Sequence, residues 1–132
     1  MNSIPDSHRD LLESKFATLA TVGADGYPQV SEVWFLATGD TVAMSLTTGR
    51  QKTKNLMHRS VCSLLILDLV NPFRYLELRG DVKMSPDDDH AFADRMEAKY
   101  GTNPSEYDQP GDKRLVVTLH LTRVNAVDVP TS

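Results

Sequence analysis

Apolar and polar residues alternate along much of this chain, and this period of two predicts short β-strands. The clearest alternation places four apolar side chains on one side of a strand: Leu115, Val117, Leu119 and Leu121. Residues 60–67 are almost continuously apolar, which favours a buried strand. Further strands are predicted at residues 16–22, 27–36, 41–47, 73–84 and, after a bend at 122–123, at 124–129. Turn signals such as Asp25-Gly26 leave only short connections, so six or seven strands close most simply as an antiparallel barrel.

One well-defined helix is predicted after the strand at residues 73–84. Ser85 would be its N-cap, Pro86 would take the first helical position, and Gly101 would end it. Apolar or aromatic residues recur at a spacing of four and would form its buried face: Phe92, Met96 and Tyr100. The start of this helix also carries three acidic residues, Asp87, Asp88 and Asp89. Carboxylates are stabilised by the positive end of a helix dipole, and this role explains the acidic run better than a metal site does.

Two shorter helical segments are also indicated. Asp6 or Ser7 can cap a helix around residues 11–12. The other begins after a turn at residues 48–49 and would place three side chains on the strands: Thr53, Leu56 and Met57. The predicted fold class is therefore mainly β (α+β), a six- to seven-stranded antiparallel barrel with two or three short helices in one domain, residues 1–132.

The composition narrows the functional classes. Of 132 residues, 40% are hydrophobic and 24% charged, with a formal net charge of −4, so general binding to nucleic acids or anionic membranes is not expected. No apolar run approaches the roughly 20 residues of a membrane span. The first residues show no signal-peptide pattern, and the lone Cys62 lies in an apolar strand, so a cytoplasmic protein is expected.

A basic segment lies at the corner between the strand at 41–47 and the next helix. Arg50, Lys52 and Lys54 fall in its first turns, and no Asp or Glu occurs between Asp40 and Asp68. Cations are unfavourable at a helix N-terminus, which already carries partial positive charge. Free N–H groups and cations together indicate a bound phosphate. The alternative is a solvated basic helix face.

Residues for catalysis without a cofactor are not evident. His8, His58, His90 and His120 are scattered and lack zinc-ligand spacing, so no metal site is predicted. No serine lies in a nucleophile elbow. Because no acid, base or nucleophile stands out, no catalytic residue is assigned, and a cofactor would carry the chemistry if the protein is an enzyme.

Four motifs in order give the chain a family resemblance. Residues 16–30 read FATLATVGADGYPQV, residues 49–56 read GRQKTKNL, residues 74–80 read RYLELRG, and a YDQP loop follows at 107–110. This order resembles the pyridoxamine 5′-phosphate oxidase-like split β-barrel family, over about residues 11–129. It is most similar to that family's deazaflavin (coenzyme F420)-dependent oxidoreductases.

The resemblance implies a homodimer with two cofactor grooves at its interface. It implies hydride transfer from reduced F420 to a conjugated small-molecule acceptor. The second strand would lie beside the cofactor ring, residues 45–47 would pass the ring system, and residues 50–52 would hold the phosphate, with Lys52 the most persistent member. The cofactor-binding residues expected are Gln29, Val30, Ser31, Val33, Ser45, Leu46, Thr47, Arg50, Gln51, Lys52, Lys54 and Tyr75.

The resemblance leaves alternatives open for the cofactor and the activity. Flavin relatives carry an Arg where this chain has Gln29 and often a Gln where it has Tyr75, which weakens the case for FMN. Cations spread along the helix suit F420, whose phosphodiester is followed by glutamates. An FMN-dependent oxidoreductase on the same barrel, or a non-catalytic F420 carrier, remain the alternative functions.

Overall fold

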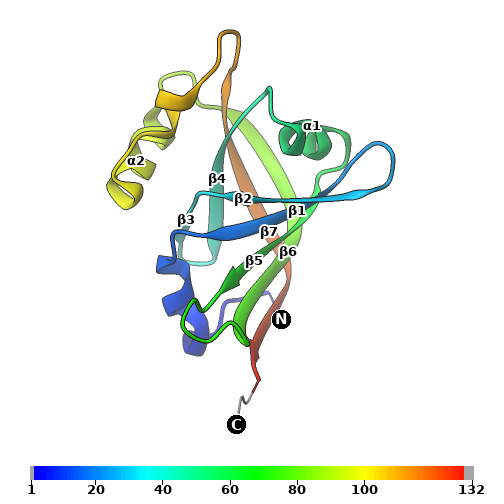
Figure 1. Cartoon of the computed structure of the whole chain (residues 1–132), viewed down its shortest axis with the longest axis vertical. Coiled ribbons are helices and arrows are strands. Elements are labelled where there is room, and N and C mark those ends of the chain that lie inside the picture. Colours follow the sequence, from blue (N-terminus) through cyan, green and yellow to red (C-terminus); the bar gives the residue numbers. More distant parts are fainter. Residues whose placement is uncertain (1, 130–132) are drawn as a thin grey trace.

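The computed structural model describes residues 2–129 as strands with short helices at their ends (Figure 1). The first half contains η1 Asp6–Glu13, β1 Ala17–Val22, β2 Pro28–Val33, β3 Phe35–Thr38, β4 Thr41–Thr47 and α1 Gln51–His58. The second half contains β5 Val61–Leu67, β6 Arg74–Pro86, α2 Ala91–Tyr100, η2 Pro104–Tyr107 and β7 Arg114–Asp128. In Figure 1 η1 and the end of β7 lie at one end of the molecule, away from α1. No helix within residues 2–129 has the length and apolar character needed to cross a membrane.

All seven strands form one antiparallel sheet in the order β2-β1-β5-β6-β7-β4-β3. Its two edge strands, β2 and β3, follow one another in the chain and are separated only by Trp34. This connection curls the sheet into a split barrel and confirms the predicted fold class. The prediction of one strand at residues 27–36 is wrong, because the chain changes partner at Trp34: Val33 pairs with Ala17 on β1 and Phe35 pairs with Met44 on β4.

The long hairpin of β6 and β7 forms the centre of the sheet. The predicted bend at residues 122–123 is a β-bulge inside one strand rather than a break between two, because Arg79 pairs with Arg123 while Gly80 pairs with Leu121. A Cβ at position 80 would collide with the His120 carbonyl, which explains the glycine there. Buried aliphatic side chains from β1 and β4–β7 fill the barrel, including Leu19, Leu64, Ile66, Leu76, Leu78 and Leu119.

The helix predicted from Ser85 and Pro86 begins later than expected. Both residues still belong to β6, where Ser85 pairs with Val116 and Pro86 with Leu115, because pairing with β7 outcompetes capping. The N-cap residue is His90, which has no side-chain cap. Instead Asp87, which is buried, accepts hydrogen bonds from the backbone N–H groups of Phe92 and Ala93 at 3.1 and 3.0 Å. Asp89 accepts a further hydrogen bond from the N–H of Ala91 at 3.1 Å, so two of the three aspartates have the helix-start role assigned to the acidic run.

Two further details of the helices differ from the sequence expectations. The first segment is a 3₁₀ helix that follows Pro5 without any side-chain cap from Asp6 or Ser7. On α1, Thr53 and Leu56 are buried as predicted, but Met57 is 57% exposed and Asn55 is buried instead. Asn55 faces β1 and β2 because its amide donates to Thr21 Oγ1 at 3.0 Å.

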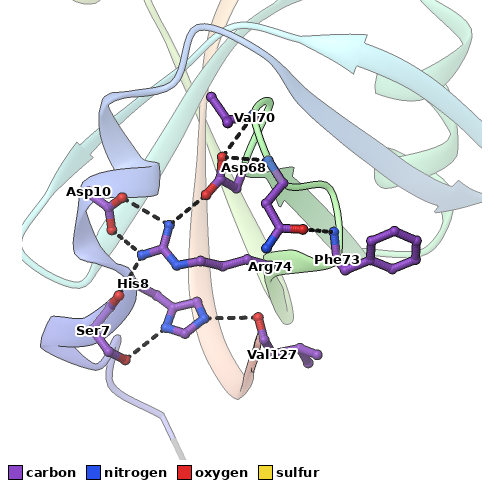
Figure 2. A network of polar contacts seen from close by, with 9 residues as sticks. Ser7, His8, Asp10, Asp68, Val70, Phe73, Arg74 and Val127 are labelled. Atoms are coloured by element: carbon purple, nitrogen blue, oxygen red, sulfur yellow. Dashed lines mark hydrogen bonds and ion pairs between the residues drawn. The ribbon is translucent and has the colours of Figure 1, made fainter. Parts of the chain in front are cut away.

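A polar network fastens η1 to the turn between β5 and β6 (Figure 2). Arg74 lies between two carboxylates and donates to Asp10 at 2.6 Å and to Asp68 at 3.2 Å. The hydrogen bond and the charge of Arg74 hold the pKa of Asp10 below its usual value. The imidazole of His8 is buried beside this network, with Nε2 3.0 Å from the carbonyl of Val127 on β7. These contacts fix the end of the barrel opposite α1.

Cys62 is buried in β5, as expected of a small apolar side chain. Burial, and to a lesser extent the negative charge of Asp81, raises the pKa of its thiol to about 12. At neutral pH the thiolate is therefore scarce, and this cysteine is unsuited to nucleophilic chemistry.

Candidate functional site

The corner between β4 and α1 presents cations and free backbone N–H groups together. Arg50 is the N-cap residue of α1, and the helix has neither a side-chain cap nor an acidic residue in its first turn. The first amides of the helix therefore lack side-chain acceptors, and they point towards the same end as the cations. The loop packs closely here, since a Cβ at Gly49 would meet the carboxylate of Asp112. Such a helix end favours an anionic ligand.

Lys52 is the cation of this corner whose pKa responds to its environment. Its ammonium is half-buried and donates to the backbone carbonyl of Glu32 on β2 at 3.3 Å. Burial lowers the pKa of Lys52, and the nearby charge of Arg50 lowers it further, while the charge of Glu32 acts in the opposite direction. Within residues 2–129 neither Lys52 nor Arg50 forms an ion pair with a carboxylate. An anion bound between Lys52 and Arg50 would offset the repulsion between their two positive charges.

A groove of about 430 Å³ leads from this corner across the barrel. It brings together six of the residues expected to bind the cofactor: Val33, Ser45, Leu46, Thr47, Arg50 and Lys52. The edge strand β2 and strand β4 contribute residues to its walls. The groove is therefore basic at its α1 end, and along its length it is bounded by the largely buried strand β4 and the more exposed edge strand β2.

Aromatic side chains form the other end of the groove. Trp34 stacks on Tyr100 of α2, with ring centroids 4.4 Å apart and planes inclined by 9°. Tyr107 of η2 meets Trp34 edge to face at 6.3 Å. Trp34 and Tyr107 line the groove, and Phe16 adds a third exposed ring. Flat aromatic surfaces of this kind bind planar conjugated rings by stacking.

Arg114, at the start of β7, joins the aromatic end to the floor of the groove. Its guanidinium donates to Ser45 Oγ at 3.0 Å, to the Pro104 carbonyl at 2.8 Å and to the carboxylate of Asp108 at 3.0 Å. The side chain of Arg114 is only 6% exposed, whereas that of Asp108 is 22% exposed, so the arginine is buried and its carboxylate partner keeps some access to solvent. Arg114 thereby fixes the loop that carries Tyr107 relative to β4.

The remaining expected residues lie outside this groove. Gln29 and Gln51 line a separate hollow beside α1, where both amides hydrogen-bond to Asn55. Val30 and Lys54 are exposed, and Tyr75 lies on β6 between Leu67 and Val127. Ser31 Oγ is buried without a hydrogen-bond partner among the described residues.

Several groove residues were not assigned to the site from the sequence, although two of them, Phe16 and Tyr107, belong to the family motifs. The residues not assigned are Lys15, Phe16, Glu32, Trp34, Pro104, Tyr107 and Arg114. One feature of the sequence could have indicated Trp34. It is the single tryptophan of the chain, and the alternation of apolar and polar residues shifts at this position. No feature of the sequence indicated Arg114, because its partners Ser45 and Asp108 lie 69 and 6 residues away and only folding brings them together.

No cluster of three or more metal-binding side chains occurs within the described chain. The site thus consists of a split antiparallel barrel, a basic helix corner and an aromatic wall, an arrangement that belongs to the split β-barrel class of folds. The model of the pyridoxamine 5′-phosphate oxidase family matches residues 4–128, so the chain belongs to that family, as the motifs predicted.

Solved structures agree with this assignment. A protein named F420 reductase is 33% identical, with 92% of this chain and 98% of that chain covered and a TM-score of 0.80. A conserved hypothetical protein from Mycobacterium tuberculosis is 22% identical over 99% of this chain and 92% of its own, with a TM-score of 0.76. A heme storage protein from Vibrio cholerae is 20% identical over 96% of both chains, with a TM-score of 0.75. The last two show a shared fold only. A comparison with curated protein sequences gave no match.

Proposed function

We propose that this protein binds coenzyme F420 and, with the reduced cofactor, transfers hydride to a conjugated small-molecule acceptor. The observation that carries the proposal is the division of the groove between charge and apolar surface. One end has two cations that form no ion pair within residues 2–129, and the other end has an aromatic wall. A phosphate-bearing tricyclic ring has the same division between charge and flat apolar surface. The 33% identity to a protein named F420 reductase supports F420 in particular.

The residues present fit such a ligand. Arg50, Lys52 and the first amides of α1 would hold the phosphate. Thr47, Leu46 and Val33 would pack along the ring, and Ser45 is held in position by Arg114. When bound, the cofactor supplies the hydride. The chain contributes binding, orientation and shielding from water, which suits a barrel without a recognisable catalytic acid or base.

The alternatives differ in cofactor or in turnover. FMN also carries a phosphate and a tricyclic ring, so the basic corner accommodates either cofactor. Gln29 is held in a network with Asn55 beside α1, which favours a structural role over phosphate binding. A carrier would bind F420 in the same groove without reducing any acceptor.

A titration of the purified apoprotein with each cofactor tests the proposal. We expect F420 to bind more tightly than FMN, and its affinity to fall as ionic strength rises, because screening weakens several exposed charge contacts at once. Binding is measured by fluorescence or calorimetry at low and at high salt. Tighter binding of FMN under both conditions would support the FMN-dependent alternative. Binding of reduced F420 without turnover of any quinone or enone would support the carrier.

A homodimer is the second expectation. The outer face of edge strand β2 exposes Val30 at 65%, and Phe16, just before β1, is exposed at 56%, which leaves apolar surface on a part of the sheet that lacks a neighbour on one side. We expect sedimentation to give a dimer at micromolar concentration. Val30→Asp is expected to shift it to monomer, whereas Met57→Asp, at the similarly exposed Met57 on α1, is not. A monomeric parent with tight F420 binding contradicts the expectation.

A further inference from the structure

The hydroxyl of Ser45 lies in the groove and accepts a hydrogen bond from a buried cation. Nη1 of Arg114 donates to Ser45 Oγ at 3.0 Å and to the Ser45 carbonyl at 3.4 Å. A serine hydroxyl has one proton and two lone pairs, so this contact leaves the proton free. Among residues 2–129 no acceptor takes that proton. The groove therefore contains an unused hydrogen-bond donor whose orientation is set by Arg114.

Arg114 itself has no donor left for a ligand. Its guanidinium makes five hydrogen bonds, to Ser45, to the Pro104 carbonyl and to the carboxylate of Asp108. Asp108 also balances its positive charge. The donor that faces the groove at this point is thus a neutral hydroxyl beside a compensated ion pair. Such a donor suits a neutral carbonyl oxygen better than an anion, because an anion would be repelled by the Asp108 carboxylate.

The position of Ser45 is on the aromatic side of the groove. On β4 it lies two residues before Thr47, the last residue of the strand and the one next to the basic corner, which is a rise of about 6.6 Å. In the other direction, Arg114 ties Ser45 to η2, the element that carries Tyr107. Trp34 and Tyr107 line the same groove. A flat ligand stacked on these two rings would therefore have an edge beside the Ser45 hydroxyl.

We infer that Ser45 donates a hydrogen bond to the carbonyl oxygen of a flat conjugated acceptor stacked on Trp34 and Tyr107, and that Arg114 positions the hydroxyl. The inference rests on the proposed function and narrows the acceptor to quinones and conjugated ketones. When a hydride adds to such a molecule, a C–H bond forms, an electron pair of the conjugated system moves to the carbonyl oxygen, and water supplies the proton that this oxygen takes. The hydrogen bond from Ser45 strengthens as negative charge develops on the oxygen.

Equilibrium dialysis of the full-length apoprotein compares menadione, a flat quinone, with 2-methylnaphthalene, which has the same carbon skeleton without oxygen. We expect Ser45→Ala to weaken menadione binding about fivefold, the scale of one net hydrogen bond, and to leave 2-methylnaphthalene unchanged. Ser45→Thr keeps a hydroxyl and should retain menadione binding. Ser63→Ala, at a serine of β5 outside the groove, should change neither probe. Quenching of the single tryptophan, Trp34, reports whether menadione binds at the aromatic wall.

Two further variants separate stacking from positioning. Trp34→Leu should weaken both probes alike, because stacking does not depend on the oxygen. Arg114→Lys should lower the ratio of menadione affinity to 2-methylnaphthalene affinity, a ratio that does not depend on the folded fraction. When Ser45 is already alanine, Arg114→Lys should lower this ratio no further. An unchanged ratio in Arg114→Lys alone would overturn the positioning role of Arg114.

Three results would contradict the role of Ser45. Equal weakening of both probes by Ser45→Ala, or unchanged menadione binding, would overturn the hydrogen bond to the oxygen. Displacement of menadione by oxidised F420 would place a ring carbonyl of the cofactor at Ser45 and overturn its assignment to the acceptor. Dialysis of the probes needs no F420. A protein that does not bind F420 but keeps the preference for menadione that depends on Ser45 would therefore contradict the proposed function alone.

Discussion

Lys52→Ala is expected to weaken the binding of F420 by about 1.5–3 kcal/mol, the scale of a hydrogen bond to a charged group. The reason is its position: a half-buried ammonium at the start of α1, beside Arg50 and without an ion pair among the described residues. Stability should change little, because removing a cation from a helix N-terminus is neutral or slightly stabilising. Calorimetric titration gives the affinity, and thermal unfolding gives the stability.

Lys83→Ala is the matched control, since Lys83 is an exposed lysine on β6 outside the groove. It should leave F420 affinity unchanged. Arg50→Ala should weaken binding in the same direction but less, because Arg50 is the more exposed of the two cations. If Lys52→Ala binds F420 like the parent and unfolds at a lower temperature, Lys52 has a structural role and the phosphate site is misplaced.

Arg114→Met should destabilise the protein by about 2–3 kcal/mol, the upper part of the range for buried groups that lose their hydrogen-bond partner, because the Asp108 carboxylate left behind is 22% exposed. The substitution leaves the carboxylate of Asp108 without its partner and removes the donors to Ser45 and Pro104. Urea unfolding, with the slope compared between variants, measures the change. F420 affinity of the folded fraction should also fall, because the loop with Tyr107 loses its attachment to β4.

Arg79→Met provides the comparison for an exposed pair. Arg79 contacts Glu77 at 3.2 Å with its own side chain 51% exposed, so its loss should change stability by at most about 1 kcal/mol. Asp108→Asn keeps an oxygen acceptor for Arg114 and should be milder than Arg114→Met. A change below about 1 kcal/mol for Arg114→Met would show that the buried pair does not stabilise the fold.

The split barrel was predictable because its signals are local. Alternating apolar residues, hairpin turns and a basic segment after Gly49 each lie within a few residues of one another, and together they specified the strands, α1 and the cations at its start. The family followed from the same local motifs, and the family match over residues 4–128 confirms it. The start of α2 was misplaced because strand pairing between Ser85 and Val116 outcompetes a local capping signal.

The walls of the site were decided by contacts between distant parts of the chain. Trp34 lines the groove because the chain changes strand partner there, and Tyr100, 66 residues later in the chain, supplies the surface on which it stacks. Arg114 reads as an ordinary charged residue until β7 places it beside Ser45 and Asp108. Burial and pairing of a side chain depend on which strands become neighbours. The sequence by itself thus determined the fold and the basic corner, and only the tertiary structure decided which aromatic and buried charged groups complete the groove.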